Sequence, residues 1–260
     1  MQYPRQASPI EEIAVRGLTW ALIGMIFGFI FAVLAEIQGT YLPGPLGQLA
    51  AIAAAAALTA LFYGSMRLTV LVANLTFIAT LVYTWKGSAI FGLEPLVLIG
   101  AAIGVLVGAT YGWKDKRSRV FCADAKVLAG AAAGVLGGAL VLGLEAVIGQ
   151  LEGAWRAMVL APLATSIYIA LAPWFVRRCR TLLPPILDGA LVGLGVGGVT
   201  GVLFMVMVGT FAPEMIPSAP LQALVQRVEQ AWPGIVVGCS LVCFPVGVAR
   251  ALLKRPWYDL

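Results

Sequence analysis

The sequence predicts an all-α, polytopic integral membrane protein with about eight transmembrane helices. Hydrophobic residues make up 61% of its 260 residues and charged residues only 11%, and its mean hydropathy is +0.96. An α-helix needs roughly 20 apolar residues to cross a hydrocarbon core, and eight stretches of the chain approach or exceed that length. Strands of a membrane barrel would alternate apolar and polar residues over about ten positions. These stretches are continuously apolar, so helices are predicted.

The eight predicted spans follow one another with short connections and leave no room for a separate soluble domain, so residues 1–260 form a single transmembrane domain. Only Gly64-Ser65-Met66-Arg67 separates the second span from the third, and a single helix across both would be about twice the length that a bilayer requires. A tight turn is therefore predicted at that point. We expect the first span to be kept as a signal anchor, because few basic residues precede it. In chain order the spans cover residues 17–37, 46–66, 68–85, 94–113, 124–148, 155–176, 184–211 and 234–253.

The segment before the last span predicts an amphipathic helix over residues 219–232. Apolar residues, among them Leu221, Val225 and Val228, recur there at helical spacing, and glutamine and charged residues lie on the opposite face. A helix of this kind lies in the membrane interface. It could serve as a connector resting on lipid headgroups, as a lid over an outer cavity, or as a docking face for a partner.

The distribution of Lys and Arg predicts that both termini are cytoplasmic. With the N-terminus inside, fourteen of these residues fall on the inner side and three on the outer side, namely Lys86, Arg156 and Arg227. Basic residues accumulate on the cytoplasmic side of membrane proteins. This bias places the chain in the bacterial inner (plasma) membrane as a multi-pass protein. It also explains the net charge of +5 without nucleic acid, whose binding proteins gather basic residues on a soluble face.

Glycines at intervals of four residues predict how the helices pack. Residues at i and i+4 share one helix face, and a face without Cβ atoms allows the close backbone approach that drives helix association in lipid. Helical phase places Leu96 and Val202 on lipid-facing sides of the same helices. Residues 128–138 also resemble residues 187–198, either through an internal duplication or through glycine-rich composition alone. The predicted packing positions are Gly24, Gly28, Gly100, Gly104, Gly108, Gly112, Gly130, Gly134, Gly138, Gly189, Gly193, Gly197 and Gly201.

The chain contains no histidine, and this excludes haem b held by two His ligands, the usual zinc sites and Ser-His-Asp catalysis. No CxxC pair and no phosphate-binding loop is present. We therefore predict no catalytic residue, no metal site and no cofactor, although bound lipid is compatible with the sequence. Cys239 and Cys243 lie four residues apart on one helix face and are interpreted as small packing residues.

A few polar residues within or beside the spans are candidate substrate or ion contacts, because ionisable groups at membrane depth are costly. Glu36, Glu94 and Glu145 map near the outer ends of their helices and could line an acidic vestibule, or could simply reach the headgroup zone. Asp188 could pair with a nearby arginine or bind a cation, or could favour the start of its helix through the helix dipole. Asn74 lies near the middle of the third span, with Thr76 and other threonines along that helix, where interhelical hydrogen bonding would explain it.

These observations favour a non-catalytic integral membrane subunit that scaffolds or docks onto a larger inner-membrane complex, in contact with membrane lipids and with other membrane protein subunits. The alternative is a small transporter or channel for a cation or small solute, with an acidic outer vestibule. A transporter usually shows broken helices or polar pairs near the midplane. Only Asn74 approaches that position, so the subunit hypothesis comes first.

Overall fold

The computed structural model describes residues 9–86, 92–114, 121–178, 183–216 and 218–253, and within these ranges every regular element is a helix. Eight of these helices are long and apolar enough to cross a membrane, which confirms the predicted fold class. The elements are α1 (Pro9–Tyr41), α2 (Pro45–Phe62), α3 (Met66–Lys86), α5 (Pro95–Lys114), α6 (Ala123–Ile148), α7 (Gly153–Arg178), α8 (Pro185–Phe211), the short 3₁₀ turn η1 (Pro213–Met215) and α9 (Ala219–Leu252).

The boundary between the second and third spans is a tight turn. Helix α2 ends at Phe62 and α3 begins at Met66, while Gly64 adopts a φ of +74°. Glycine tolerates this left-handed conformation because it has no Cβ. The largest difference from the predicted spans lies at the N-terminus, where α1 is longer than residues 17–37 at both ends.

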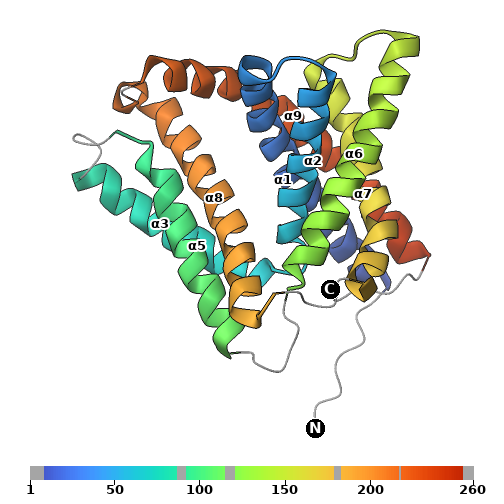
Figure 1. The fold of residues 1–260 in the computed structure, drawn as a ribbon, viewed down its shortest axis with the longest axis horizontal. Coiled ribbons are helices and arrows are strands. Elements are labelled where there is room, and N and C mark those ends of the chain that lie inside the picture. The colour runs from blue at the N-terminus through green and yellow to red at the C-terminus, as the bar shows by residue number, and fades with distance from the viewer. Residues whose placement is uncertain (1–8, 87–91, 115–120, 179–182, 217, 254–260) are drawn as a thin grey trace.

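The last two predicted elements, 219–232 and 234–253, form one helix, α9, with Pro233 inside it. The expectation of two separate elements was therefore wrong. Proline removes one helical hydrogen bond and bends a helix rather than necessarily ending it. The first part of α9 crosses between the end of α8 and the end of α1, and the remainder then descends through the bundle (Figure 1). In this first part Val225 and Val228 are buried, whereas Gln226 and Arg227 are exposed.

The helices form two groups. Helices α3, α5 and α8 pack together, and α1, α2, α6, α7 and α9 make up the second group, with sparser contacts from α8 to α2, α6 and α9 joining the two. Figure 1 shows α8 diverging from α1 and α2 between the groups. Helix α1 begins and α9 ends at the same end of the bundle (Figure 1), where the Arg16 guanidinium donates to the carbonyl of Arg250.

Helices α5 and α8 are antiparallel and meet backbone to backbone along their glycines. A Cβ atom added at Gly104 would lie within 3.0 Å of Gly193, and one added at Gly108 would lie equally close to Gly189. Gly100 faces Gly197 and Gly201, and Gly112 faces Pro185. No real Cβ atom comes that close to another backbone. This contact therefore depends on the missing side chains, and it aligns the two helices over four turns.

The other glycine-bearing helices meet different partners. Gly24 and Gly28 of α1 pack against the backbone of α9 and against Cys239, and Gly24 also contacts Cys243. Gly130 and Gly134 of α6 pack against α2 near Ala56 and Ala53, and Gly138 faces Leu49 and Ile52. The resembling segments 128–138 and 187–198 therefore contact unrelated neighbours, α2 for the first and α5 for the second.

The expectation that Leu96 faces lipid was wrong, because its side chain is fully buried. It packs in an apolar cluster with Met205, Ile216 and Val225, since η1 and the first part of α9 fold over the start of α5. Val202 is half-buried. Seven of the basic residues assigned to the inner side lie outside the described residues, namely Arg5, Lys116, Arg117, Arg119, Arg180, Lys254 and Arg255.

Candidate functional site: a buried charge junction

The most distinctive polar feature of the molecule is the carboxylate of Asp188, which is buried where α6 and α8 begin. One oxygen accepts the backbone N–H of Ala123 at 2.6 Å, and the other accepts those of Phe121 and Cys122 at 3.2 Å. Cys122 adopts a left-handed conformation with a φ of 48°. Successive N–H groups in such a turn form a concave anion site. The N–H groups at the start of a helix have no acceptor within that helix. Asp188 of α8 provides acceptors for those at the start of α6.

Lys126 lies three residues after Ala123, at the end of the first turn of α6, and is the largest fully buried side chain among the described residues. Its Nζ donates to the backbone carbonyl of Tyr63 at 2.6 Å, where α2 ends. A cation at a helix C-terminus is favoured by the helix dipole. Lys126 is also within the electrostatic influence of Asp188. The ammonium group thus donates to the carbonyl at the end of α2 and lies within the electric field of the Asp188 carboxylate.

Together Lys126 and Asp188 join three helix ends drawn from both helix groups. Helix α8 belongs to one group, and α2 and α6 belong to the other. Removing a hydrogen-bond partner from a buried polar group typically costs about 1–3 kcal/mol, and more when the group is charged. We name this arrangement of Lys126, Asp188, the Tyr63 carbonyl and the N–H groups of residues 121–123 the charge junction.

The sequence left three interpretations of Asp188 open: a pair with a nearby arginine, a cation site, or a carboxylate that favours the dipole of its own helix. Asp188 does lie in the first turn of α8, and its carboxylate in addition caps a second helix, α6. Lys126 was assigned to the cytoplasmic boundary as one basic residue among many, although it is 0% exposed. One signal could have identified it, because a lysine in the first turn of a helix opposes the helix dipole. Such a residue needs a specific partner.

Glu145 forms an ion pair at the opposite end of α6. Its two carboxylate oxygens accept from the Nε and a terminal nitrogen of Arg156 at 2.6 and 3.1 Å. The Glu145 side chain is 7% exposed and that of Arg156 is 19% exposed. Bidentate pairing of this kind is among the stronger charge interactions in proteins. It fastens the end of α6 to the start of α7.

The two remaining acidic candidates have other surroundings. Glu36 lies 3.2 Å from the Nε of Arg227 in the first part of α9, and both side chains are partly exposed. Glu94 directly precedes α5, and its backbone carbonyl accepts the N–H of Val97. The three carboxylates Glu36, Glu94 and Glu145 are thus not brought together in either of the two cavities described below.

Asn74 is exposed, and its amide donates to the carbonyl of Val70 one turn earlier in α3. Thr84 likewise bonds to carbonyls of its own helix. Among the described residues Asn74 thus bonds within its own helix, contrary to the interhelical hydrogen bond expected of it. The explanation is local, because a short polar side chain in lipid satisfies itself most easily on the preceding turn. Thr76 and Thr80 are buried, and their hydroxyls have no hydrogen-bond partner among the described residues.

Two cavities accompany these polar sites. The larger has a volume of about 460 Å³ and lies between α1, α2 and α8, with Val97 of α5 and Val127 of α6 at its margins. Every residue that lines it is apolar or glycine. The lining of this cavity between the two helix groups therefore favours apolar groups over ions. We name this cavity the apolar groove.

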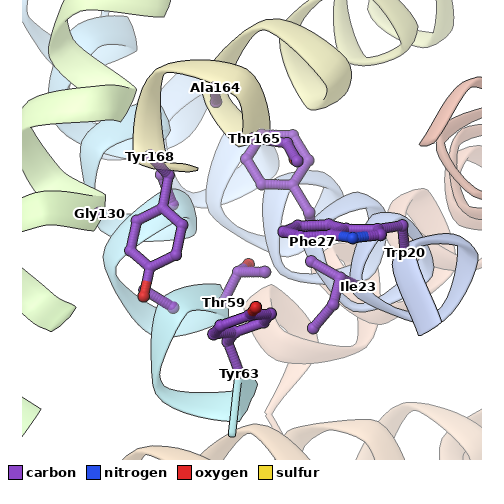
Figure 2. Close-up of a pocket in the computed structure, with 11 residues that line it drawn as sticks. Trp20, Ile23, Phe27, Thr59, Tyr63, Gly130, Ala164, Thr165 and Tyr168 are labelled. Atoms are coloured by element: carbon purple, nitrogen blue, oxygen red, sulfur yellow. The ribbon is translucent and has the colours of Figure 1, made fainter. Parts of the chain in front are cut away.

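The smaller cavity, of about 30 Å³, is lined by the rings of Trp20, Tyr63 and Tyr168 (Figure 2). Trp20 stacks on Tyr63 with ring centroids 5.4 Å apart, and Tyr168 meets Tyr63 edge to face. The buried hydroxyl of Tyr168 has no hydrogen-bond partner among the described residues. A cavity of this size can hold water, which would satisfy that hydroxyl.

Among the described residues, no group of three or more Cys, Asp or Glu side chains could hold a metal ion. Cys122, Cys239 and Cys243 are buried without a disulfide, and Cys179 lies outside the described residues. Comparisons of the chain with protein-family models, with curated proteins and with solved structures gave no match.

Proposed function

We propose that this protein is a non-catalytic membrane subunit that scaffolds or docks onto a larger membrane protein complex. The observation that carries the proposal is that the buried charged side chains bond to partners within the protein. Among the described residues the buried charged side chains are Arg16, Lys126, Glu145 and Asp188. Arg16 pairs with Glu12, and Lys126 donates to the Tyr63 carbonyl. Glu145 pairs with Arg156, and Asp188 accepts the N–H groups of residues 121–123. Lys126, Glu145 and Asp188 bond across helices, and no buried charged side chain among the described residues lines either cavity.

The outer surface of the smaller helix group supports the same proposal. Helix α3 exposes a series of large apolar side chains, including Phe77, Ile78 and Trp85, and it packs mainly against α5 and α8. An apolar helix face at membrane depth can contact lipid or the helix of another subunit equally well. A docking subunit needs a face of this kind, and α3 presents one.

We further propose that the protein resides in the bacterial inner membrane with both termini in the cytoplasm. The support is the excess of Lys and Arg in alternate connections, together with an even number of spans. A reporter fused after Leu260 should be active in the cytoplasm, and one inserted at Ser218 should report the outer compartment. A C-terminal reporter active only outside would contradict this orientation.

A second candidate is a small-solute transporter, and the charge junction is the observation that favours it. Few contacts join the two helix groups, and the buried side chains of Lys126 and Asp188 lie where they meet. Rocking of one helix bundle against another is a common basis of alternating access. Spin labels on the outward positions Leu106 and Leu140, on the two groups, would reveal two distance populations in lipid if the groups rock. A single narrow distance in lipid would count against transport.

Gentle purification from native membranes tests the subunit proposal. The chain would be extracted with its lipid in polymer-bounded discs, and its companions would be identified and counted by mass spectrometry. We expect a companion membrane chain at a fixed ratio that persists through size-exclusion chromatography. A monodisperse particle that contains one copy and no companion would contradict the proposal.

A further inference from the structure

The apolar groove has the dimensions of one lipid chain. Its lining on α8 runs from Leu191 to Val202, which at 1.5 Å per residue is about 16 Å. That length is close to half of a hydrocarbon core of roughly 30 Å, the depth of one leaflet. Its volume of about 460 Å³ falls within the range of about 300–1,000 Å³ that is typical of small-molecule sites.

The position of the groove determines what can fill it. Its lining belongs to helices that are long and apolar enough to span a membrane. Water that entered the groove would find no side chain to hydrogen-bond with. On α8, Gly198 lines the groove, and a Cβ added there would meet no other heavy atom within 4 Å. The missing side chain keeps this wall open. Leu34 and Ile37 of α1 form part of the opposite wall.

A polar pair of complementary charge lies one helical turn beyond the lining residue Val33 of α1. Glu36 shares a helix face with Val33, three residues earlier, and lies 3.2 Å from Arg227. The Arg227 side chain is 50% exposed and that of Glu36 is 31% exposed, so both charges can reach a ligand. A terminal nitrogen of Arg227 also lies 3.4 Å from the Thr40 hydroxyl. A headgroup with a phosphate and an ammonium group matches this pair, because the guanidinium donates to phosphate and the carboxylate accepts from ammonium.

We propose that the apolar groove binds one acyl chain of a phosphatidylethanolamine molecule from the surrounding membrane, whose zwitterionic headgroup lies against Glu36 and Arg227. The bound chain fills the space between the two helix groups and completes their packing. This site is independent of any companion subunit, because it is built from this chain alone.

The test is retention of lipid by the full-length protein. The protein would be reconstituted in discs that contain equal amounts of phosphatidylethanolamine and phosphatidylglycerol, extracted in mild detergent, and examined by native mass spectrometry. We expect one tightly held phosphatidylethanolamine per chain. Gly198→Leu fills the groove and should abolish most of that retention. Gly143→Leu is the matched control, because a Cβ added at Gly143 also meets no atom within 4 Å but Gly143 does not line the groove.

Two further arms keep the proposal falsifiable if Gly198→Leu fails to fold. Glu36→Gln should lower the preference for phosphatidylethanolamine over phosphatidylglycerol while an acyl chain is still retained, because only phosphatidylethanolamine carries the ammonium group that this carboxylate would accept from. A phosphatidylethanolamine with a photoactivatable acyl chain should label the lining of α1 and α8 in the unmodified protein. Labelling no stronger there than at the exposed Leu140, undiminished retention in Gly198→Leu, or a co-purifying polypeptide crosslinked to the groove would each overturn the proposal.

Discussion

Adding a single methyl group at Gly197 should separate α5 from α8, whereas the same change at the next residue, Gly198, should be tolerated. An added Cβ at Gly197 would lie within 3.0 Å of the carbonyl group of Gly100 on α5. The obstructing atoms belong to a helix backbone, so a change of rotamer cannot relieve the clash and the helices must move apart. At Gly198 no heavy atom lies within 4 Å of the added Cβ.

The magnitude follows from comparing the two variants. Both replace glycine by alanine in the same helix, so the intrinsic helix preference of about 1 kcal/mol for alanine cancels in the comparison. The remaining difference is the cost of overpacking, typically about 1–3 kcal/mol. We therefore expect Gly197→Ala to be less stable than Gly198→Ala by an amount in that range.

The assay is the folded fraction in detergent after heating, followed by size-exclusion chromatography, with free energies taken from reversible titration with a denaturing detergent. Gly104→Ala should behave like Gly197→Ala, because a Cβ there would meet the backbone of Gly193. Equal stability of Gly197→Ala and Gly198→Ala would show that α5 and α8 do not approach as closely as described, and the packing argument would fail.

The buried charges give two further predictions in the same assay. Asp188→Asn should cost at least about 1–3 kcal/mol, because it removes the negative charge that accepts three buried backbone N–H groups. The double variant with Lys126→Met should lose less than the sum of the two single variants, because Asp188 influences the charge of Lys126, and strictly additive losses would show that the two charges do not interact. Glu145→Gln, which breaks a largely buried bidentate pair with Arg156, should destabilise the protein clearly more than Glu36→Gln, whose partly exposed pair is worth only about 0–1 kcal/mol. Equal effects would contradict the burial difference.

The helices were predictable from the sequence because lipid imposes a length and an apolar composition on every span. The tight turn at Gly64 followed from the same argument, since no single helix of that length was needed. The continuity of α9 through Pro233 was not predictable. A proline that bends a helix and one that separates two helices have the same local sequence, and packing of the following residues decides between them.

The charge junction shows why the contacts of a site could not all be predicted from the sequence. Asp188 was recognisable as a costly polar residue near a helix start, but its ligands are backbone N–H groups of residues 121–123. Every residue type except proline carries a backbone N–H group, so the sequence does not reveal which of these groups will bind a carboxylate. The contact also joins positions far apart in the chain. Pairing of Glu145 with Arg156 was easier to anticipate, because a short connection between two spans keeps both side chains at one end of the bundle.

Photo-crosslinking in intact native membranes tests the subunit proposal most directly. A photoreactive residue would be placed in turn at Ile78, Leu106 and Leu140, whose side chains are exposed, and at Val72, which is fully buried in α3 and serves as the control. We predict that at least one exposed position yields a discrete product with the same companion chain and that Val72 yields none. Products with lipid alone at every exposed position would contradict the account.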